Sequence, residues 1–400
     1  SSQGYPRRNY KAKIKKAKTR IYTGGPDKDG SFSKLHLDNA YVGETSFTWK
    51  ADYMESSGSH NTGLASYLDI LYSKHPIQDY IPDYDLARDK YRTTIYGFPV
   101  MVFHKYTDGT CEFVGKYSFN LDKGCNDTWG FTDTTPHPGS NLPFEQVCEC
   151  WELTNNQGTR CAFKKVDFEE TDEVGKLSLL NDFEVRYSYY GDEIETAYTD
   201  YPSYEEANAF LLDKFRNLRD LSLWLETTDV DKATNELFET PKVYAGKTFT
   251  NDTAECRLAK FKTEFDSHFD KEYTFVYFII SELLLAYDSR GKNMMLSTYG
   301  PKTPGGPYIW YPIFYDIDTQ LGINNSGIPT WEYNVDATLT GQFSTSNSVL
   351  WTNLYTCYLE EIKAKYQALR GQLLNYNNLN GYYNCNPDVS KSYAMMGARP

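Results

Sequence analysis

The chain has 400 residues, and its 41 Lys and Arg against 54 Asp and Glu give a formal net charge of −13. Hydrophobic residues make up 40% of it and charged residues 24%, which excludes a disordered chain. The net acidity argues against nucleic acid as a partner, because neutralising phosphates requires concentrated Lys and Arg. No apolar run reaches the roughly 20 residues of a membrane-spanning helix, so we expect no membrane span.

Residues 1–122 are predicted to form a β-rich N-terminal lobe that contains one helix. The expected elements are strands over 10–21, 46–53, 98–106 and 111–119 and a helix over 62–72. The sequence Tyr106-Thr107-Asp108-Gly109 joins the last two strands and is typical of a hairpin turn. This lobe also holds eight basic residues and no acidic residue within its first 20 positions.

Residues 123–200 are rich in turn-forming residues, and we interpret them as an insertion or hinge region. A zinc site is one hypothesis for their cysteines, which are Cys125, Cys148, Cys150 and Cys161. The Cys-x-Cys spacing departs from the usual knuckle spacing of two to four residues, so free thiols are the alternative that we expect. The irregular spacing of all eight cysteines also favours reduced thiols over a disulfide framework.

Residues 201–375 are predicted to form a mostly helical C-terminal lobe that includes one hairpin, and residues 376–400 an irregular tail. Helices are expected over 204–226, 253–265, 273–287 and 349–374, and hairpin strands over 294–299 and 308–315. Ser203 with Glu206 three residues later forms a capping box at the start of the first of these helices. The fold class that we predict is therefore α+β.

Four polar residues follow elements of the predicted helix and hairpin, and they are Asp288, Asn293, Asp316 and Asp318. Because hairpin strands lie side by side, we expect Asp288, Asn293 and Asp316 at neighbouring loop ends. Phosphoryl transfer uses this inventory, since one carboxylate orients the attacking hydroxyl while an amide and another carboxylate hold Mg²⁺. Asp288 and Asn293 also have the Asp-x₄-Asn spacing of protein kinases.

Three other interpretations of these residues differ in strength. An EF-hand loop is excluded, because Gln320 and Leu321 stand where an oxygen ligand and a glycine would be needed. A glycosidase could pair Asp288 with Asp316 or Asp318 and use aromatic side chains as sugar platforms. The simplest alternative is that the same residues only cap turns and helix ends.

The chain resembles the spore coat protein H (CotH) family, whose members are atypical protein kinases with a divergent, two-lobed kinase-like fold. Four segments carry the resemblance, and they are 1–10 (Ser-Ser-Gln-Gly-Tyr-Pro-Arg-Arg-Asn-Tyr), 47–53 (Phe-Thr-Trp-Lys-Ala-Asp-Tyr), 98–123, and 287–322 with its Asp-Ile-Asp-Thr-Gln-Leu-Gly end. Departures from the family's pattern are Arg7-Arg8-Asn9 in place of Lys-Lys-Ser and Tyr315 in place of a Trp. The last of the four segments is the most specific.

The resemblance implies a role for each matching residue and implies Mg²⁺ and ATP as cofactors. Asp288 would be the catalytic aspartate, Asn293, Asp316 and Asp318 would hold the metal, and Lys50 would pair with the nucleotide phosphates. Ser2 and Gly4 would belong to the phosphate-covering loop, with Arg8 behind it. The acidic partner of the lysine is left open between Glu44 and Glu55.

Relatives of this family also occur inside bacteriophage structural proteins, and the opening segment and the many Tyr and Asn residues are similar to theirs. This resemblance implies a domain of a virion or tail protein, or otherwise an extracellular or cell-surface protein. Three functions follow: a protein Ser/Thr kinase, a structural module contacting other virion proteins or a host surface, and a carbohydrate-binding module. The third would use aromatic platforms such as Trp310, Trp331 and Trp351.

Overall fold

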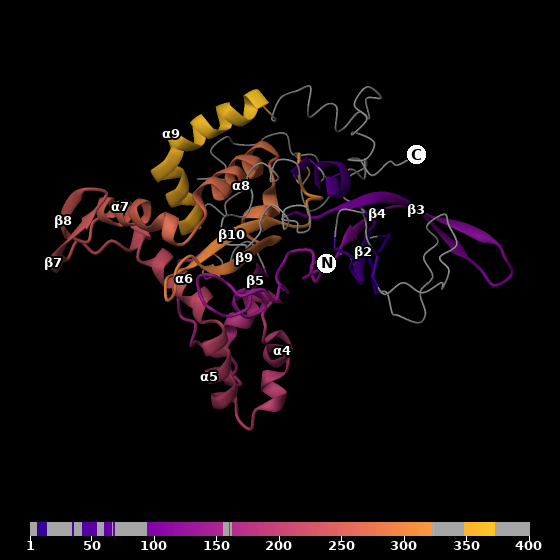
Figure 1. Cartoon of the computed structure of the whole chain (residues 1–400), viewed down its shortest axis with the longest axis horizontal. Coiled ribbons are helices and arrows are strands. Elements are labelled where there is room, and N and C mark those ends of the chain that lie inside the picture. Colours follow the sequence, from indigo (N-terminus) through magenta and orange to yellow (C-terminus); the bar gives the residue numbers. More distant parts are fainter. Residues whose placement is uncertain are drawn as a thin grey trace. The chain divides into compact units, whose positions relative to one another are not determined.

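A computed structural model shows a mixed α+β chain with antiparallel sheets (Figure 1). It describes residues 6–13, 34–35, 42–53, 60–65, 67–68, 94–154, 160, 162–321, 323 and 348–372, and only the backbone of Tyr287 and Asp288. The chain divides into two compact units. Unit 1 comprises residues 1–133, 314–330 and 369–400, and unit 2 comprises residues 134–313 and 331–368. The division follows Asp133, not the predicted end of the N-terminal lobe at residue 122.

Unit 1 is built on a four-stranded antiparallel sheet with the strand order β1-β2-β4-β3. Its strands are β1 (Tyr10–Lys13), β2 (Ser46–Lys50), β3 (Gly97–Lys105) and β4 (Cys111–Leu121). The expected strands in this region are thus confirmed, although residues 14–21 of the first lie outside the described residues. Phe47 and Leu121 lie opposite each other between β2 and β4, and both pack into a core with Tyr96 and Cys125.

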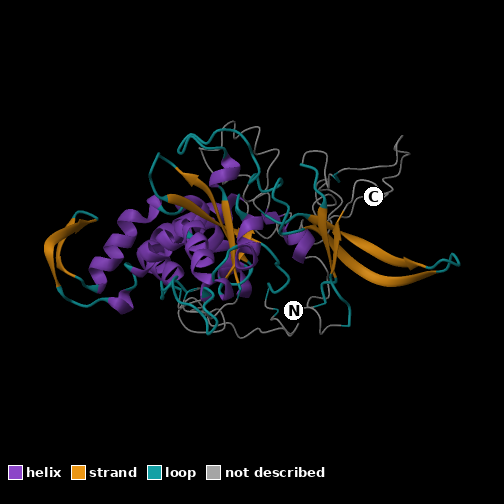
Figure 2. Ribbon diagram, turned by 90° about the horizontal axis from the view of Figure 1, so that it is seen from below, coloured by secondary structure: helices purple, strands orange, loops and turns teal. Residues whose placement is uncertain are grey.

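The strands β3 and β4 continue past the sheet as a two-stranded ribbon, because β2 pairs only with Ser118–Leu121 of β4 (Figure 2). The predicted turn closes this ribbon, and Gly109 adopts a φ of 89°, which suits a residue without a Cβ. Large apolar side chains on the ribbon face solvent, since Met101 is 65% exposed, Phe103 58% and Phe113 56%. At the helix expected over 62–72 the structure shows a π-helical turn, η2 (His60–Leu64), and residues 66 and 69–72 lie outside the described residues.

Unit 2 contains a second antiparallel sheet with the order β10-β9-β5-β6. Its strands are β5 (Glu149–Leu153), β6 (Phe183–Tyr187), β9 (Met294–Pro301) and β10 (Tyr308–Phe314). The predicted hairpin over 294–315 is therefore confirmed. The region over 123–200, interpreted from the sequence as an insertion or hinge, supplies two of these strands, β5 and β6. All of β5 is buried, so it lacks the polar–apolar alternation by which a strand is found from sequence.

The helices of unit 2 include the α4–α5 helical hairpin, which extends from this sheet (Figure 1). They are α3 (Phe144–Val147), η3 (Ser178–Asn181), α4 (Gly191–Asp200), α5 (Tyr204–Lys214), α6 (Arg216–Glu226), η4 (Val230–Lys232), α7 (Ala254–Glu264), η5 (Phe265–Ser267), α8 (Lys271–Leu283), η6 (Tyr287–Arg290) and α9 (Val349–Gln372). One predicted helix over 204–226 is in fact two, because the chain breaks at Phe215. That side chain is fully buried, with its ring centre 4.3 Å from the Trp151 ring centre.

A short hairpin of β7 (Leu237–Tyr244) and β8 (Lys247–Asn251) precedes α7 and was not predicted from the sequence. The helix α9 changes direction at Tyr358, whose backbone angles are not helical and whose ring packs against Phe261, Phe265 and Phe275. None of the helices in the described part of the chain has the length and apolar character needed to cross a bilayer.

Candidate functional site

The candidate site in unit 1 is organised around Lys50, the last residue of β2. Its side chain is only 7% exposed, and its ammonium donates a hydrogen bond to Oδ1 of Asp316 at 2.8 Å. The same ammonium lies 4.5 Å from the centre of the Tyr315 ring. Burial alone would lower the pKa of Lys50, but Asp316, Tyr315 and Asp318 together outweigh burial and raise this pKa above its ordinary value. Lys50 is therefore a buried and charged group.

Asn61 of η2 links Lys50 to the segment around Asp316. Its Oδ1 accepts from the Lys50 ammonium at 3.2 Å and from the backbone N–H of Ile317 at 3.1 Å. Its Nδ2 donates to Oδ1 of Asp52 at 3.0 Å. Asn61 is fully buried, so these bonds hold the lysine and the Asp316 segment at one place without solvent.

Two carboxylates of this network stand on unusual backbone. Asp52 has a φ of 44° and Asp316 a φ of 49°, both in the left-handed region that non-glycine residues rarely adopt. Asp52 is held by the Ser118 hydroxyl as well as by Asn61. Strained backbone of this kind persists where the surroundings fix it, and it is concentrated at binding and catalytic sites.

Asp318 brings a second carboxylate to the segment that carries Asp316. It is half-buried, it contributes to the raised pKa of Lys50, and its backbone carbonyl lies 3.0 Å from Nδ1 of His60. The side chain of Asp316 is 31% exposed even though Lys50 contacts it. Two carboxylates within three residues, one of them partly open to solvent, are oxygen ligands suited to a hard cation such as Mg²⁺. The donor chemistry therefore fits that metal.

The role predicted for the phosphate-binding residues at the N-terminus stays a prediction. Ser2 and Gly4 lie outside the described residues, and Arg8 is exposed. The neighbouring Arg7 guanidinium donates to the backbone oxygen of Lys116 at 3.1 Å. Asn9 accepts from the backbone N–H of Ala51 at 2.8 Å, which connects this segment to the residue that follows Lys50.

The remaining predicted residues, Asp288 and Asn293, belong to unit 2. The backbone of Asp288 lies in η6, and its side chain lies outside the described residues. Asn293 is 6% exposed and has a φ of 65° just before β9. The expectation that they surround one metal together with Asp316 stays a prediction.

No protein-family model matches the sequence, and no curated protein sequence matches it either. The resemblance to the CotH family therefore depends on the four sequence segments alone. Among the residues that carry it, Lys50, Asp316 and Asp318 are brought together in unit 1.

The partner of Lys50 differs from both residues left open in the sequence. Glu44 instead accepts hydrogen bonds from the backbone and the hydroxyl of Thr128, and Glu55 lies outside the described residues. Sequence reasoning missed Asn61, Asp52 and Ser118, because buried polar contacts between distant residues leave no periodic signal. The one available signal was a polar residue directly before the predicted helix over 62–72.

The carbohydrate-binding hypothesis loses support because its two described tryptophans are buried. Trp310 and Trp351 are each 1% exposed, so neither offers a ring face for a sugar, and Trp331 lies outside the described residues. The zinc hypothesis concerns four cysteines. Among the residues that the structure describes there is no group of three or more His, Cys, Asp or Glu arranged for a metal. The Cys125 thiol donates to the backbone oxygen of Ser46, and Cys161 lies outside the described residues.

Proposed function

We propose that this protein binds a nucleotide with Mg²⁺ and transfers a phosphoryl group to a protein Ser or Thr, as a two-lobed, kinase-like protein similar to the CotH family. The observation that carries the proposal is the 2.8 Å contact between the buried Lys50 ammonium and Asp316, residues that lie 266 positions apart. A strand lysine and a metal-binding aspartate are the two fixed points that position phosphates in protein kinases.

In this proposal Lys50 exchanges Asp316 for the nucleotide phosphates, and Asp316 and Asp318 hold the metal. Mg²⁺ neutralises the charge that develops on the transferred phosphoryl group. Asn61 keeps the lysine ammonium in place through the exchange, because its Oδ1 also accepts from Ile317. Asp288 would accept the proton of the attacking hydroxyl, in keeping with the Asp-x₄-Asn spacing.

The test measures the melting temperature with Mg²⁺ and a non-hydrolysable ATP analogue. A ligand at about 100 times its dissociation constant stabilises the native state by about 2.7 kcal/mol. We expect this gain for the natural protein and for Lys13→Met, which removes an exposed lysine from the same sheet. We expect no gain for Lys50→Met or Asp316→Asn. An equal gain for Lys50→Met would contradict the nucleotide site.

Catalysis is tested separately by transfer of labelled γ-phosphate to a generic protein acceptor or to the protein itself. Asp288→Asn should abolish transfer while the nucleotide still raises the melting temperature. Equal label incorporation by this variant and the natural protein would rule out Asp288 as the catalytic residue.

A second candidate function is an architectural module of a virion that contacts another virion protein or a host surface. Two observations favour it: Lys50 already neutralises Asp316, and the β3–β4 ribbon exposes Met101, Phe103 and Phe113. Exposed apolar side chains gathered on one element are typical of protein interaction sites. Finding the protein at fixed copy number in purified particles, with no nucleotide bound, would favour this candidate over the enzyme.

A further inference from the structure

A pocket of about 490 Å³ lies between the β7–β8 hairpin and α7, entirely within unit 2. An irregular strand pairing forms it. The register pairs Leu237 with Asn251 and Lys242 with Phe249, so the residues 238–241 of β7 face only Thr250 of β8. Such a bulge turns side chains out of the regular alternation and is frequent beside binding sites. Here it leaves Phe238 and Lys242 lining the pocket.

The walls of the pocket are fixed by contacts outside it. At the hairpin turn, the backbone N–H of Ala245 donates to the Thr263 hydroxyl at 2.8 Å. At the hairpin base, the backbone N–H of Asn235 donates to the Asp252 backbone oxygen at 2.8 Å. The ring of Phe249 is buried. A hairpin held at both ends leaves a preformed space, and a preformed space reduces the entropic cost of binding.

At one end of the pocket, the charges of Arg257 and Asp252 neutralise each other. The Arg257 guanidinium binds both carboxylate oxygens of Asp252, at 2.8 Å and 2.6 Å, and also donates to two backbone carbonyls. Thr234 donates to the same carboxylate through its backbone and its hydroxyl. This ion pair therefore has no charge left for a ligand.

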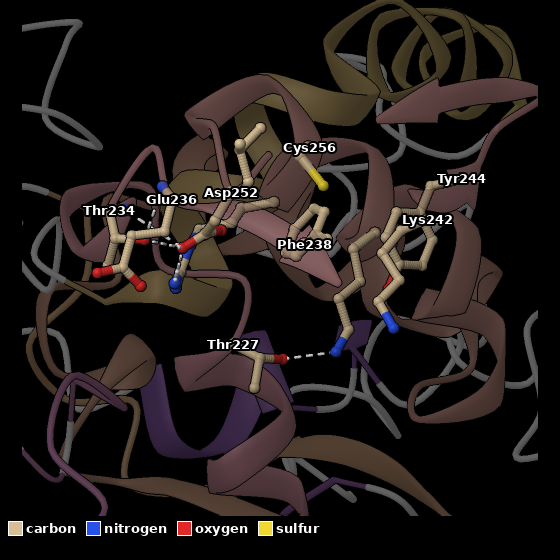
Figure 3. Close-up of a pocket in the computed structure, with 11 residues that line it drawn as sticks. Thr227, Thr234, Glu236, Phe238, Lys242, Tyr244, Asp252 and Cys256 are labelled. Carbon is tan, nitrogen blue, oxygen red and sulfur yellow. Dashed lines mark hydrogen bonds and ion pairs between the residues drawn. The ribbon is translucent and has the colours of Figure 1, made fainter. Parts of the chain in front are cut away.

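The other end carries two ammonium groups. Lys260 donates to the Thr227 hydroxyl at 2.8 Å, and its distance to the nearest carboxylate, Glu264, is 3.7 Å. Lys242 has no hydrogen-bond or ion-pair partner within the described part of the chain. Figure 3 shows Lys242 and Tyr244 on one side of the pocket, Glu236 and Asp252 on the other, and Phe238 and Cys256 between them.

We propose that this pocket binds a small organic anion, with its apolar body on Phe238 and Cys256 and its single charged group held by Lys242 and Lys260. The half-buried Phe238 ring and the buried Cys256 supply the apolar surface. Glu236 lines the opposite side and pairs with no cation among the described residues, so it repels a second negative charge there. The charged group is a carboxylate or a phosphate, since two ammonium groups can donate hydrogen bonds to either.

Titration calorimetry of the full chain with phenylacetate and with phenyl phosphate tests the proposal. We expect saturable binding of at least one, and the one that binds identifies the charged group. Lys242→Gln and Lys260→Gln should each weaken this binding by about tenfold, because each removes a charge-assisted hydrogen bond. Benzyl alcohol, which has the same ring but no charge, should show no saturable binding.

Two matched variants make the result specific. Lys247→Gln removes a lysine from the same hairpin that pairs with Glu255 outside the pocket, and it should leave the affinity unchanged. Lys50→Met should also leave it unchanged, which separates this pocket from the proposed nucleotide site. Absence of saturable binding for both anions, or an equal loss of affinity in Lys247→Gln, would overturn the proposal.

Discussion

Two buried cations, Lys50 in unit 1 and Arg290 in unit 2, differ in how far along the sequence their ion-pair partners lie. Arg290 donates to the Ser281 hydroxyl at 2.9 Å and to a backbone carbonyl of the same helix, and it forms an ion pair with Glu282. Its guanidinium also lies 4.3 Å from the Phe278 ring centre. Lys50 is held instead by Asn61 of η2 and by Asp316, which lies 266 positions away in the sequence.

The comparison separates a structural cation from a candidate functional one. The hydrogen bonds and the ion pair of the Arg290 side chain come from within 12 residues and fix a helix end in the core. The Lys50 ammonium joins segments that lie 266 positions apart, and its partner Asp316 has strained backbone and is partly open to solvent. In the proposed function a nucleotide replaces Asp316 at Lys50, whereas replacing the partners of Arg290 would disrupt α8.

The largest expected effect is for Arg290→Met. This change leaves the Glu282 carboxylate without its cation and removes the contacts with the Phe278 and Trp351 rings. The Glu282 carboxylate is 34% exposed and can regain water, so the loss comes mainly from the hydrogen bonds to the buried Ser281 hydroxyl and the Phe278 carbonyl and from the two ring contacts. Together we expect these to lower the free energy of unfolding by about 4 kcal/mol. Urea unfolding, monitored by hydrogen exchange in α8, measures the change in the free energy of unfolding. A loss below that of Lys50→Met would invalidate the comparison.

The second effect extends the comparison to a buried anion, Glu149 of β5. Burial raises the pKa of Glu149 to about 7, although hydrogen bonds from Asn217 and Trp151 oppose the rise. Between the unfolded pKa near 4.5 and the folded pKa, the native state binds more protons than the unfolded state. Stability should therefore decrease by about 3 kcal/mol as the pH rises through this window and stay level above it.

Melting temperatures between pH 4 and pH 9 check this slope. Glu149→Gln should flatten it, and Glu145→Gln, which changes a neighbouring carboxylate with no such burial, should leave it unchanged. A slope of the same size in Glu149→Gln would show that another group causes it.

A smaller loss of stability is expected for Lys50→Met. Without Lys50, the Asp316 carboxylate has no ion-pair partner from β2, but it is 31% exposed and can regain water. Asn61 keeps its hydrogen bonds to Ile317 and Asp52. We expect a loss of about 2 kcal/mol, less than half of the upper range for a fully buried pair. Urea unfolding followed by hydrogen exchange in β2 measures it. A loss greater than that of Arg290→Met would mean that Lys50 is the structural cation of the two.

The smallest effect provides a baseline for a purely local contact. Ser203→Ala removes the hydroxyl that accepts from the Glu206 backbone N–H at the start of α5. Loss of an N-cap costs about 1 kcal/mol, which a shift in the melting temperature detects. Thr134→Ala, which removes an exposed loop hydroxyl without a hydrogen bond among the described residues, is the control. No difference between the two variants would contradict the capping role.

Local chemistry made much of the fold predictable. The Ser203 cap, the Asp108-Gly109 turn and the hairpin of β9 and β10 all follow from residue types at short spacing. The break at Phe215 was missed, because neither glycine nor proline marks it and tertiary packing against Trp151 causes it. The strand β5 was missed because all of its residues are buried.

The site was less predictable than the fold. Lys50 and Asp316 were proposed from a family resemblance, and no spacing rule connects residues so far apart in the sequence. Asn61 was missed for the same reason, since its importance arises from three contacts that only the folded chain creates. Short-range signals therefore identify elements, while a network of buried polar groups requires coordinates.

The solvent-facing ribbon of β3 and β4 also carries a site for covalent labelling. Cys111 lies next to the ribbon turn and is the one exposed thiol among the described cysteines, while Cys125, Cys148, Cys150 and Cys256 are buried. A maleimide dye should therefore attach at Cys111 faster than at any of these four. Without a reductant, two molecules should become covalently linked through this position, so purification calls for a thiol reagent or a serine in its place.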